Sequence, residues 1–207
     1  MSNNRQQGFT LIELLVALAI GALLLMGIAS SIAAITQAQN LTRDYEQVQE
    51  TLRFTTSLIS RSLRTAEVLA NDTANNATTT NNQLSVKRMG AAGRLSCIGE
   101  EPSEGVEFFE TYYQPAGTNH LACRVGATTE IIAYDISSFE LKCLIYHHVD
   151  QQMLAHYEDC AGATHAEVIA VRVKLAFDAT EFRRLEGYSD HVFTATLRSR
   201  LRERATQ

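Results

Sequence analysis

Cysteine and histidine are the residue types in this 207-residue chain whose spacing is compatible with metal chemistry. His147 follows Cys143 by four residues, and His156 precedes Cys160 by the same interval. Two cysteines and two histidines can hold a zinc ion in tetrahedral geometry. The competing interpretation is that the cysteines are oxidised, because an even number of cysteines in an exported domain typically forms disulfides.

All four cysteines lie beyond a long apolar N-terminal segment, which favours an oxidising compartment and disulfides over zinc. We predict two disulfides, with no metal and no other cofactor. Three pairings are possible. The sequence-local pairing is preferred, since each bond then closes a loop of about 20–30 residues, worth about 3 kcal/mol in the loop-entropy model. It joins Cys97 to Cys123 and Cys143 to Cys160.

Acidic residues are concentrated between Glu100 and Glu167, where twelve acids accompany two bases. A dense group of glutamates begins this region: Glu100, Glu101, Glu104, Glu107 and Glu110. Clustered carboxylates can serve acid–base catalysis or bind calcium. The chain, however, has no EF-hand-like loop, no Gly-x-Ser-x-Gly elbow, no Walker loop and no His-Glu-x-x-His motif. We therefore expect a solvated acidic surface, no enzymatic activity and no small-molecule substrate.

Composition indicates one globular domain with an appendage. Hydrophobic residues make up 45% of the chain, charged residues 20%, and the formal net charge is −5. A general nucleic-acid-binding protein is usually basic, so this class is disfavoured. The averages conceal a strong segregation, because no charged residue occurs from Leu14 to Thr42 and four arginines occur from Arg198 to the end.

The apolar segment at residues 9–35 is predicted to be a transmembrane helix, since about 20 apolar residues span the ~30 Å hydrocarbon core. A cleaved signal peptide is the competing interpretation, with Ala33-Ala34 as a weak cleavage site, but the apolar run is too long and continues into helical sequence. Glu13 interrupts the run. A carboxylate inside a bilayer costs about 2.5–3.5 kcal/mol on insertion scales, which indicates either a function or a side chain that reaches back to the interface.

The residues around Glu13 resemble the type IV prepilin signal. The run Gly8-Phe9-Thr10-Leu11-Ile12-Glu13 follows a short polar leader with Arg5 and precedes an uninterrupted apolar helix. The resemblance implies that a prepilin peptidase cuts between Gly8 and Phe9, removes the leader at residues 1–8 and N-methylates Phe9. It also implies subunit assembly through Glu13, because the new amine of Phe9 on one subunit can pair with the carboxylate of the next. Arg5 favours an N-in orientation.

Residues 36–70 are predicted to continue the helix as an amphipathic half. Apolar residues recur at heptad spacing, at Leu41, Tyr45, Val48, Leu52, Ile59 and Ala66. Phe54 and Leu58 widen this stripe, and only about three heptads are present, so packing on a sheet is favoured over a free-standing coiled coil. The polar residues 71–83, rich in Asn and Thr, predict an exposed loop between helix and sheet.

Beyond residue 83 the hydrophobic period changes to two, which is typical of β-strands. Such runs occur at 84–88, 106–113, 120–125, 129–135, 139–145, 169–177 and 193–197. No long helical pattern separates them, which indicates an antiparallel sheet with hairpins. The predicted fold class is α+β, with a long N-terminal helix packed on the antiparallel sheet of a globular domain at residues 71–207. The resemblance to pilins implies the same architecture.

Two further segments resemble one group of pilins. Residues 47–66 are similar to the helix of PilW-type minor pilins and of the related J-type minor pseudopilins of type II secretion, and residues 191–200 are similar to the end of the PilW type. The resemblance implies a minor pilin that takes part in type IV pilus assembly, in a priming or tip complex with other minor pilins and the major pilin at the inner-membrane assembly platform. It implies an inner-membrane protein with a periplasmic C-terminal domain, and later a place in the pilus at the cell surface. The alternatives are a J-type pseudopilin and a membrane-anchored periplasmic binding protein.

Overall fold

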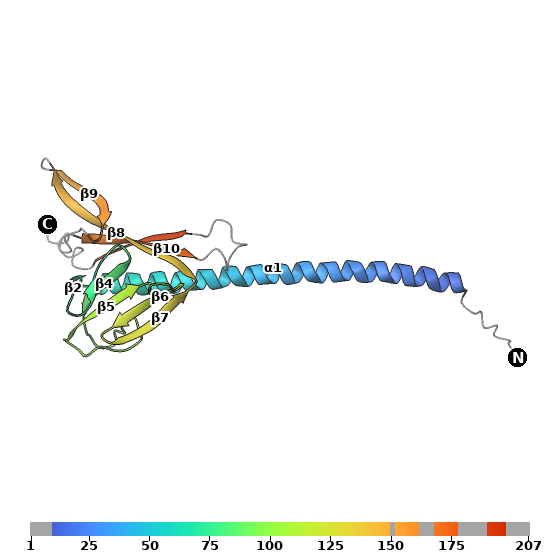
Figure 1. The fold of residues 1–207 in the computed structure, drawn as a ribbon, viewed down its shortest axis with the longest axis horizontal. Coiled ribbons are helices and arrows are strands. Elements are labelled where there is room, and N and C mark those ends of the chain that lie inside the picture. The colour runs from blue at the N-terminus through green and yellow to red at the C-terminus, as the bar shows by residue number, and fades with distance from the viewer. Residues whose placement is uncertain (1–9, 150–151, 162–167, 178–189, 198–207) are drawn as a thin grey trace. The chain divides into compact units, whose positions relative to one another are not determined.

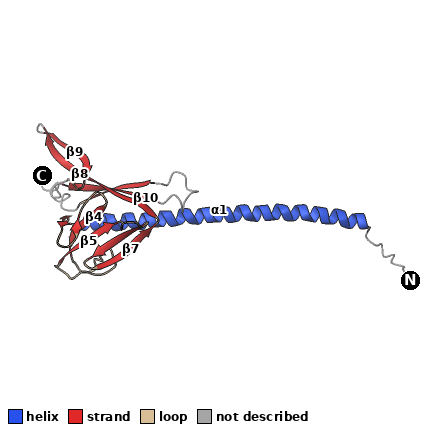
Figure 2. Cartoon of the chain, in the orientation of Figure 1, coloured by secondary structure: helices blue, strands red, loops and turns tan. Residues whose placement is uncertain are grey.

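A computed structural model gives the fold and describes residues 10–149, 152–161, 168–177 and 190–197 (Figure 1). Within this part of the chain one helix, α1 (Leu11–Thr65), precedes all of the strands. Figure 2 colours the helix blue and the strands red. The chain divides into two compact units, Met1–Gln47 and Val48–Gln207. The first unit contains the N-terminal part of α1. The second contains the rest of α1 and every described strand.

The strands form two larger sheets and a short hairpin, and their pairings are antiparallel. One sheet has the order β1-β4-β5-β6-β7, the other has the order β11-β10-β8-β9, and β2 pairs with β3. Their bounds are β1 (Val68–Leu69), β2 (Asn71–Asp72), β3 (Ala77–Thr78), β4 (Gln83–Met89), β5 (Glu107–Tyr113), β6 (His120–Val125), β7 (Thr128–Tyr134), β8 (Ile136–Val149), β9 (Gln152–Asp159), β10 (Val168–Phe177) and β11 (Asp190–Thr196). The predicted α+β class is confirmed, but the expected single sheet is two sheets.

The chain changes from one sheet to the other at Asp135, between β7 and β8. Asp135 has a φ of 60°, in the left-handed region that Asp tolerates better than most residues. The N–H of Ile136 then donates to the carbonyl of Asn119 at 2.9 Å. Apolar residues alternate in the same way on both sides of this bend, so periodicity alone does not reveal the change of sheet.

The helix ends earlier than expected, at Thr65 instead of residue 70. The physical reason is competition from the sheet. The N–H of Glu67 donates to the carbonyl of Lys87 at 3.0 Å, and β1 then pairs with β4. Val68 is β-branched, which suits a strand better than a helix.

The expected loop at residues 71–83 is only partly irregular, because β2 and β3 form a hairpin inside it. The carboxylate of Asp72 accepts hydrogen bonds from the N–H groups of Ala74 (3.0 Å) and Asn75 (3.2 Å). Asn76 adopts a positive φ of 52°. The Asn and Asp side chains that predict a loop therefore build a tight turn.

The C-terminal part of α1 buries one face in the second unit. The buried residues of the helix are Val48, Leu52, Thr55, Leu58, Ile59, Ser62 and Leu63. This face follows the predicted heptad stripe and packs on the sheets, as expected. Phe54 is the exception, because it is 52% exposed and does not widen the buried stripe as predicted.

Each of the two larger sheets contains one end of a different disulfide. Cys97, between β4 and β5, is bonded to Cys123 on β6, with their Cα atoms 6.3 Å apart. Cys143 on β8 is bonded to Cys160, next to the end of β9, with their Cα atoms 5.0 Å apart. This is the sequence-local pairing preferred from the spacing.

Candidate functional site

Thr10 and Glu13 define the start of α1. The N–H of Glu13 donates to the carbonyl of Thr10 at 3.1 Å and to its hydroxyl at 3.4 Å. Thr10 therefore serves as the N-cap, and its spacing from Glu13 is that of a capping box. This cap was not predicted from the sequence, although the Thr-x-x-Glu pattern is the sequence signal for it. A carboxylate in the first helical turn also interacts favourably with the helix dipole.

The first unit exposes a continuous apolar surface. Helix α1 contains an 18-residue window with a mean hydropathy of 2.6, long and apolar enough to cross a membrane, and none of this window is buried. Its few hydroxyls are satisfied within the helix, because Ser30 and Ser31 donate to the carbonyl of Gly27 at 2.8 and 3.0 Å, and Thr36 donates to that of Ile32 at 2.9 Å. These hydroxyls, like the backbone groups in the interior of the helix, are thus hydrogen-bonded within the helix, as a lipid-exposed helix requires.

Glu13 stands alone as a charge on this apolar surface. Its side chain is exposed, and within the described residues no cation forms an ion pair with it. Gly8 and Phe9, the predicted cleavage and methylation residues, lie outside the described part of the structure. The expected pairing of Glu13 with the Phe9 amine of a neighbouring subunit therefore stays a prediction.

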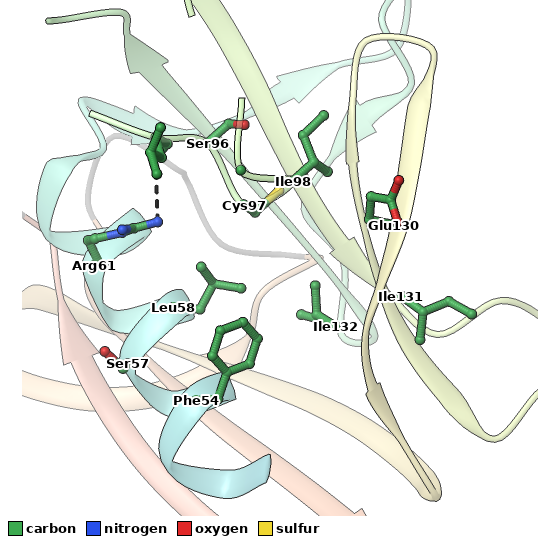
Figure 3. Close-up of a pocket in the computed structure, with 12 residues that line it drawn as sticks. Phe54, Ser57, Leu58, Arg61, Ser96, Cys97, Ile98, Glu130, Ile131 and Ile132 are labelled. Carbon is green, nitrogen blue, oxygen red and sulfur yellow. Dashed lines mark hydrogen bonds between the residues drawn. The ribbon is translucent and has the colours of Figure 1, made fainter. Parts of the chain in front are cut away.

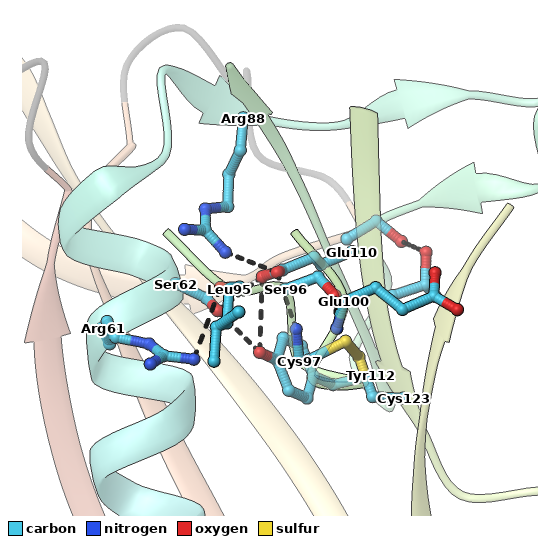
Figure 4. The surroundings of a disulfide bond; sticks show 12 residues. Arg61, Ser62, Arg88, Leu95, Ser96, Cys97, Glu100, Glu110, Tyr112 and Cys123 are labelled. Carbon is cyan, nitrogen blue, oxygen red and sulfur yellow. Dashed lines mark hydrogen bonds and ion pairs between the residues drawn. A yellow bond between two sulfur atoms is a disulfide. The ribbon is translucent and has the colours of Figure 1, made fainter. Parts of the chain in front are cut away.

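In the second unit, by contrast, the carboxylate of Glu110 on β5 is surrounded by polar partners (Figure 4). Its carboxylate forms an ion pair with Arg88 on β4, and both side chains are almost completely buried. The Ser62 hydroxyl of α1 donates to Oε2 at 2.5 Å, and the N–H of Cys97 donates to Oε1 at 2.9 Å. The Tyr112 hydroxyl lies 2.6 Å from Ser62 Oγ and donates to Glu110 Oε2 at 3.4 Å. We call these five residues the Glu110 cluster.

Strand register brings the Glu110 cluster together. Arg88 is directly opposite Phe108, and Glu110 is two residues further along the same face of β5, so the ion pair is a diagonal cross-strand pair. The Arg88 guanidinium also lies 5.3 Å from the centroid of the Phe108 ring. Tyr112 follows after two more residues. The cluster thus joins α1, two strands and the Cys97 disulfide through one carboxylate.

Burial raises the pKa of Tyr112 well above its ordinary value of 10.0, and the nearby charge of Glu110 raises it further. The hydrogen bond with Ser62 acts in the opposite direction but does not outweigh burial. Tyr112 therefore stays protonated and neutral at physiological pH. A neutral hydroxyl can donate to the carboxylate, which a phenolate could not do.

The expectation of a solvated acidic surface is right for four of the glutamates and wrong for Glu110. The four exposed ones are Glu100, Glu101, Glu104 and Glu107. The signal that distinguishes Glu110 is its alternation with Phe108 and Tyr112 on one side of a strand. Arg88 alternates in the same way with Leu84 and Val86 on the neighbouring strand. An acid and a base that each fall among apolar residues on adjacent strands indicate a buried ion pair.

The zinc site weighed from the Cys–His spacing has no free thiolates. The sulfur atoms of Cys143 and Cys160 are bonded to each other. The side chain of His147 lies outside the described part of the structure. Among the side chains that are described, no group of three or more His, Cys, Asp or Glu residues is placed to hold a metal ion.

Comparisons with known proteins bear mainly on the N-terminus. A family model for the prokaryotic N-terminal methylation motif matches residues 3–29, a range that includes Gly8, Phe9 and Glu13. Among solved structures, the chain is similar to a type IV-like pilin from Thermus thermophilus, with 13% sequence identity and a TM-score of 0.43 over 74% of this chain and 98% of that one. No curated protein matches the sequence.

Proposed function

We propose that this chain, which its N-terminal methylation motif identifies as a type IV prepilin-like protein, is a minor pilin that takes part in type IV pilus assembly. The observation that carries the proposal is the position of that motif. It lies at the start of a helix that is apolar and unburied in its first part and packed on antiparallel sheets in its last part. A chain built in this way has an anchor for assembly at one end and a folded domain at the other. The role is structural and requires no catalytic group.

Cleavage and methylation would produce the mature N-terminus of the apolar, membrane-anchoring part of α1. We propose that a prepilin peptidase removes residues 1–8 and N-methylates Phe9, which leaves a cationic amine near the cytoplasmic edge of the membrane. The apolar part of α1 would hold the chain in the inner membrane, with the second unit in the periplasm, until the subunit enters the pilus. The two disulfides suit an oxidising compartment.

Assembly would then depend on Glu13. The carboxylate has no cation beside it among the described residues and lies on a surface otherwise composed of apolar side chains. The Phe9 amine of a neighbouring subunit would supply the missing charge, because a charge removed from water is tolerated only when paired. The partners proposed here are other minor pilins, the major pilin and the inner-membrane assembly platform.

The similarity of residues 47–66 to the helices of both PilW-type pilins and J-type pseudopilins supports a second candidate, a minor pseudopilin of type II secretion. A clean deletion distinguishes the two, with surface pili and secreted enzymes assayed in parallel. Loss of pili with normal secretion supports the pilin, and the reverse result supports the pseudopilin. Complementation with the wild-type gene is the control.

Mass spectrometry of the mature N-terminus tests the processing step. We expect a chain that begins with N-methylated Phe9. A Gly8→Leu variant should remain uncleaved in the inner membrane, because the bulky side chain blocks the peptidase. A mature chain that begins near Ala34, as a conventional signal peptidase would leave it, contradicts the proposal.

A further inference from the structure

We propose that the edge strand β7 and the groove beside it form a docking site for an extended segment of a neighbouring subunit, which adds to the sheet as a further strand. The inference rests on the proposed function in one respect, namely that the chain works within a multi-subunit assembly. It concerns the second unit and does not involve the N-terminal helix contacts through Glu13.

Strand β7 lies at the edge of the five-stranded sheet, and among the described strands only β6 pairs with it. An edge strand presents unpaired N–H and C=O groups, and proteins normally protect such edges with charged residues, proline or short length. The seven residues of β7, Thr-Thr-Glu-Ile-Ile-Ala-Tyr, favour a strand strongly but include one charge, Glu130, and no proline. Residues 128–131 and Tyr134 are exposed.

The other sheet edges of the described chain are better protected. β1, at the opposite edge of the same sheet, has only two residues. β9 ends with Glu158 and Asp159, and Asp159 pairs with Lys142 on the neighbouring strand. β11 begins with Asp190, which pairs with Lys174 at 3.1 Å. Strands β7 and β11 each have seven residues and one charge, but the acid of β11 is paired with Lys174, whereas no cation of the described residues pairs with Glu130 of β7.

A groove of about 480 Å³ adjoins this edge (Figure 3). Phe54 and Leu58 of α1 lie on one side of it and Ile132 of β7 on the other, with the segment at residues 95–99 completing the walls. Its apolar walls are accessible, because Phe54 is 52%, Leu95 45% and Ile131 42% exposed. An open edge beside an exposed apolar groove is the arrangement by which a sheet binds an extended peptide, with the backbone giving affinity and side-chain pockets giving specificity.

The charges around the groove define the chemistry of the occupant. Arg61 contributes a cation on the helix side, where its guanidinium donates to the Leu95 carbonyl at 3.5 Å, and Glu130 contributes an anion on the strand side. A complementary segment carries an apolar residue for the groove, a basic residue near Glu130 and an acidic residue near Arg61. A helix lacks free backbone groups for the edge, so the occupant is an extended strand.

A second copy of β7 does not meet these requirements. Its seven residues contain an acid and no base, so pairing β7 with β7 supplies no cation for Glu130. Like charges on paired strands are destabilising. Pairing of β7 with β7 is therefore disfavoured, and within the assembly of the proposed function we commit to a strand of a different subunit that carries a base for Glu130.

Photo-cross-linking in intact cells tests this site. A photoreactive phenylalanine analogue is placed at Ile131 or Tyr134 of the full-length chain, in cells that assemble the structure to which it belongs. The matched control is Val192, an exposed apolar residue on β11, the edge of the other sheet. We expect adducts from positions 131 and 134, but not from 192, and mass spectrometry should identify the attached chain as another protein with an N-terminal methylation motif.

Charge reversal at Glu130 provides the second measurement. Glu130→Lys in the Tyr134 cross-linking background should reduce the adduct yield about fivefold or more, because it places like charges together. The thermal stability of the purified chain should not change, since Glu130 is exposed. Unchanged yield overturns the proposed orientation of charges and with it the site.

Three results overturn the inference. They are adducts between two copies of this chain, equal yields at positions 131 and 192, and no adduct at either β7 position in cells that lose pili when the gene is deleted. In the last case the minor-pilin function stands and the docking site fails. If deletion leaves pili intact but β7 cross-links to another motif-bearing subunit, the site stands and the function shifts to the pseudopilin.

Discussion

Glu13 and Glu110 are carboxylates set among apolar residues, one in each of the two compact units. Glu110 is buried, and its charge is met by Arg88, two hydroxyls and a backbone N–H. Glu13 is exposed on an unburied apolar helix, and its only described hydrogen-bonding role is local, through the cap at Thr10. The second unit thus satisfies its carboxylate internally, whereas no described residue supplies a cation for the carboxylate in the first unit.

This difference separates folding from assembly. A buried charge that keeps all of its partners contributes to a unique packing, and its loss is felt within the unit. A charge with no internal partner has little effect on folding, and its loss is felt only when another molecule would have supplied the partner. The two glutamates should therefore give opposite mutational phenotypes.

The largest effect is expected for Glu13→Ala, in assembly. The substitution leaves the Phe9 amine of the neighbouring subunit without its carboxylate, which typically costs about 3–5 kcal/mol, a factor of roughly 150 to 5,000 in association. The variant should still insert and be cleaved, and its second unit should keep its thermal stability. Co-purification with partner pilins and a count of surface pili are the measurements, and fewer pili of normal shape are expected.

Glu13→Gln is the matched variant, because it keeps the size and the local cap but removes the charge. It should behave like Glu13→Ala in assembly. If both variants co-purify and assemble like the wild type, Glu13 is an interfacial charge with a capping role only.

The next effect is expected for Glu110→Ala, in folding. It leaves the Arg88 guanidinium buried without an anion, and breaking such a pair from one side costs about 3–5 kcal/mol of unfolding free energy. Chemical denaturation of the purified full-length chain measures this. Glu107→Ala on the same strand is the control, because its ion pair with Lys87 is solvent-accessible, and such pairs contribute at most about 1 kcal/mol.

A double variant, Arg88→Met with Glu110→Leu, isolates the reason for that loss. Replacing both charges by apolar groups of similar size is often neutral or stabilising, so most of the lost stability should return. A double variant as unstable as Glu110→Ala would show that the hydrogen bonds to Ser62 and Cys97, and not the uncompensated cation, dominate.

The two units also differ in how far the sequence predicts them. The first unit is one local pattern, so a helix at residues 11–47 follows directly from the apolar run and the uncharged stretch. In the second unit the strands are local as well, and their alternation places most of them correctly. The alternation of apolar and polar residues does not indicate which strands pair with each other. The division into two sheets at Asp135 could therefore not be predicted from it.

The Glu110 cluster illustrates the same limit for a site. Its members come from α1, β4, β5 and the Cys97 segment, and composition marked Glu110 as one of five surface acids. Only the pairing of β4 with β5 brings Arg88 next to it. Residue type and spacing are therefore sufficient to find the motif at Gly8-Phe9, whose residues are adjacent in the sequence. The Glu110 cluster can be found only once the pairing of the strands is known.

A smaller effect is expected on removing each disulfide, about 3 kcal/mol by the loop-entropy model for chain separations of 26 and 17 residues. The paired variant Cys97→Ser with Cys123→Ser should lose more than Cys143→Ser with Cys160→Ser. The first bond closes the longer loop and also holds the Cys97 N–H that donates to Glu110. Denaturation of both variants under identical conditions makes the comparison. An equal or reversed order would show that the Glu110 cluster does not depend on the neighbouring disulfide.

The smallest effect is expected for Tyr112→Phe, and it depends on pH. At neutral pH the variant loses the hydrogen bonds of one hydroxyl, worth about 1 kcal/mol. Because the pKa of Tyr112 is raised above 10.0 in the folded state, mainly by burial, the folded wild type retains its proton where the unfolded chain begins to lose it. Wild-type stability should therefore fall as pH rises from about 10 toward the folded-state pKa. The Phe variant lacks this group, so the difference in unfolding free energy between the two proteins should narrow above pH 10.

Unfolding free energies from pH 7 to pH 11 measure the effect, with Tyr134→Phe as the control, since Tyr134 is 63% exposed and should follow the wild type. A constant gap across this range would mean that the Tyr112 hydroxyl reaches water, contrary to its buried position.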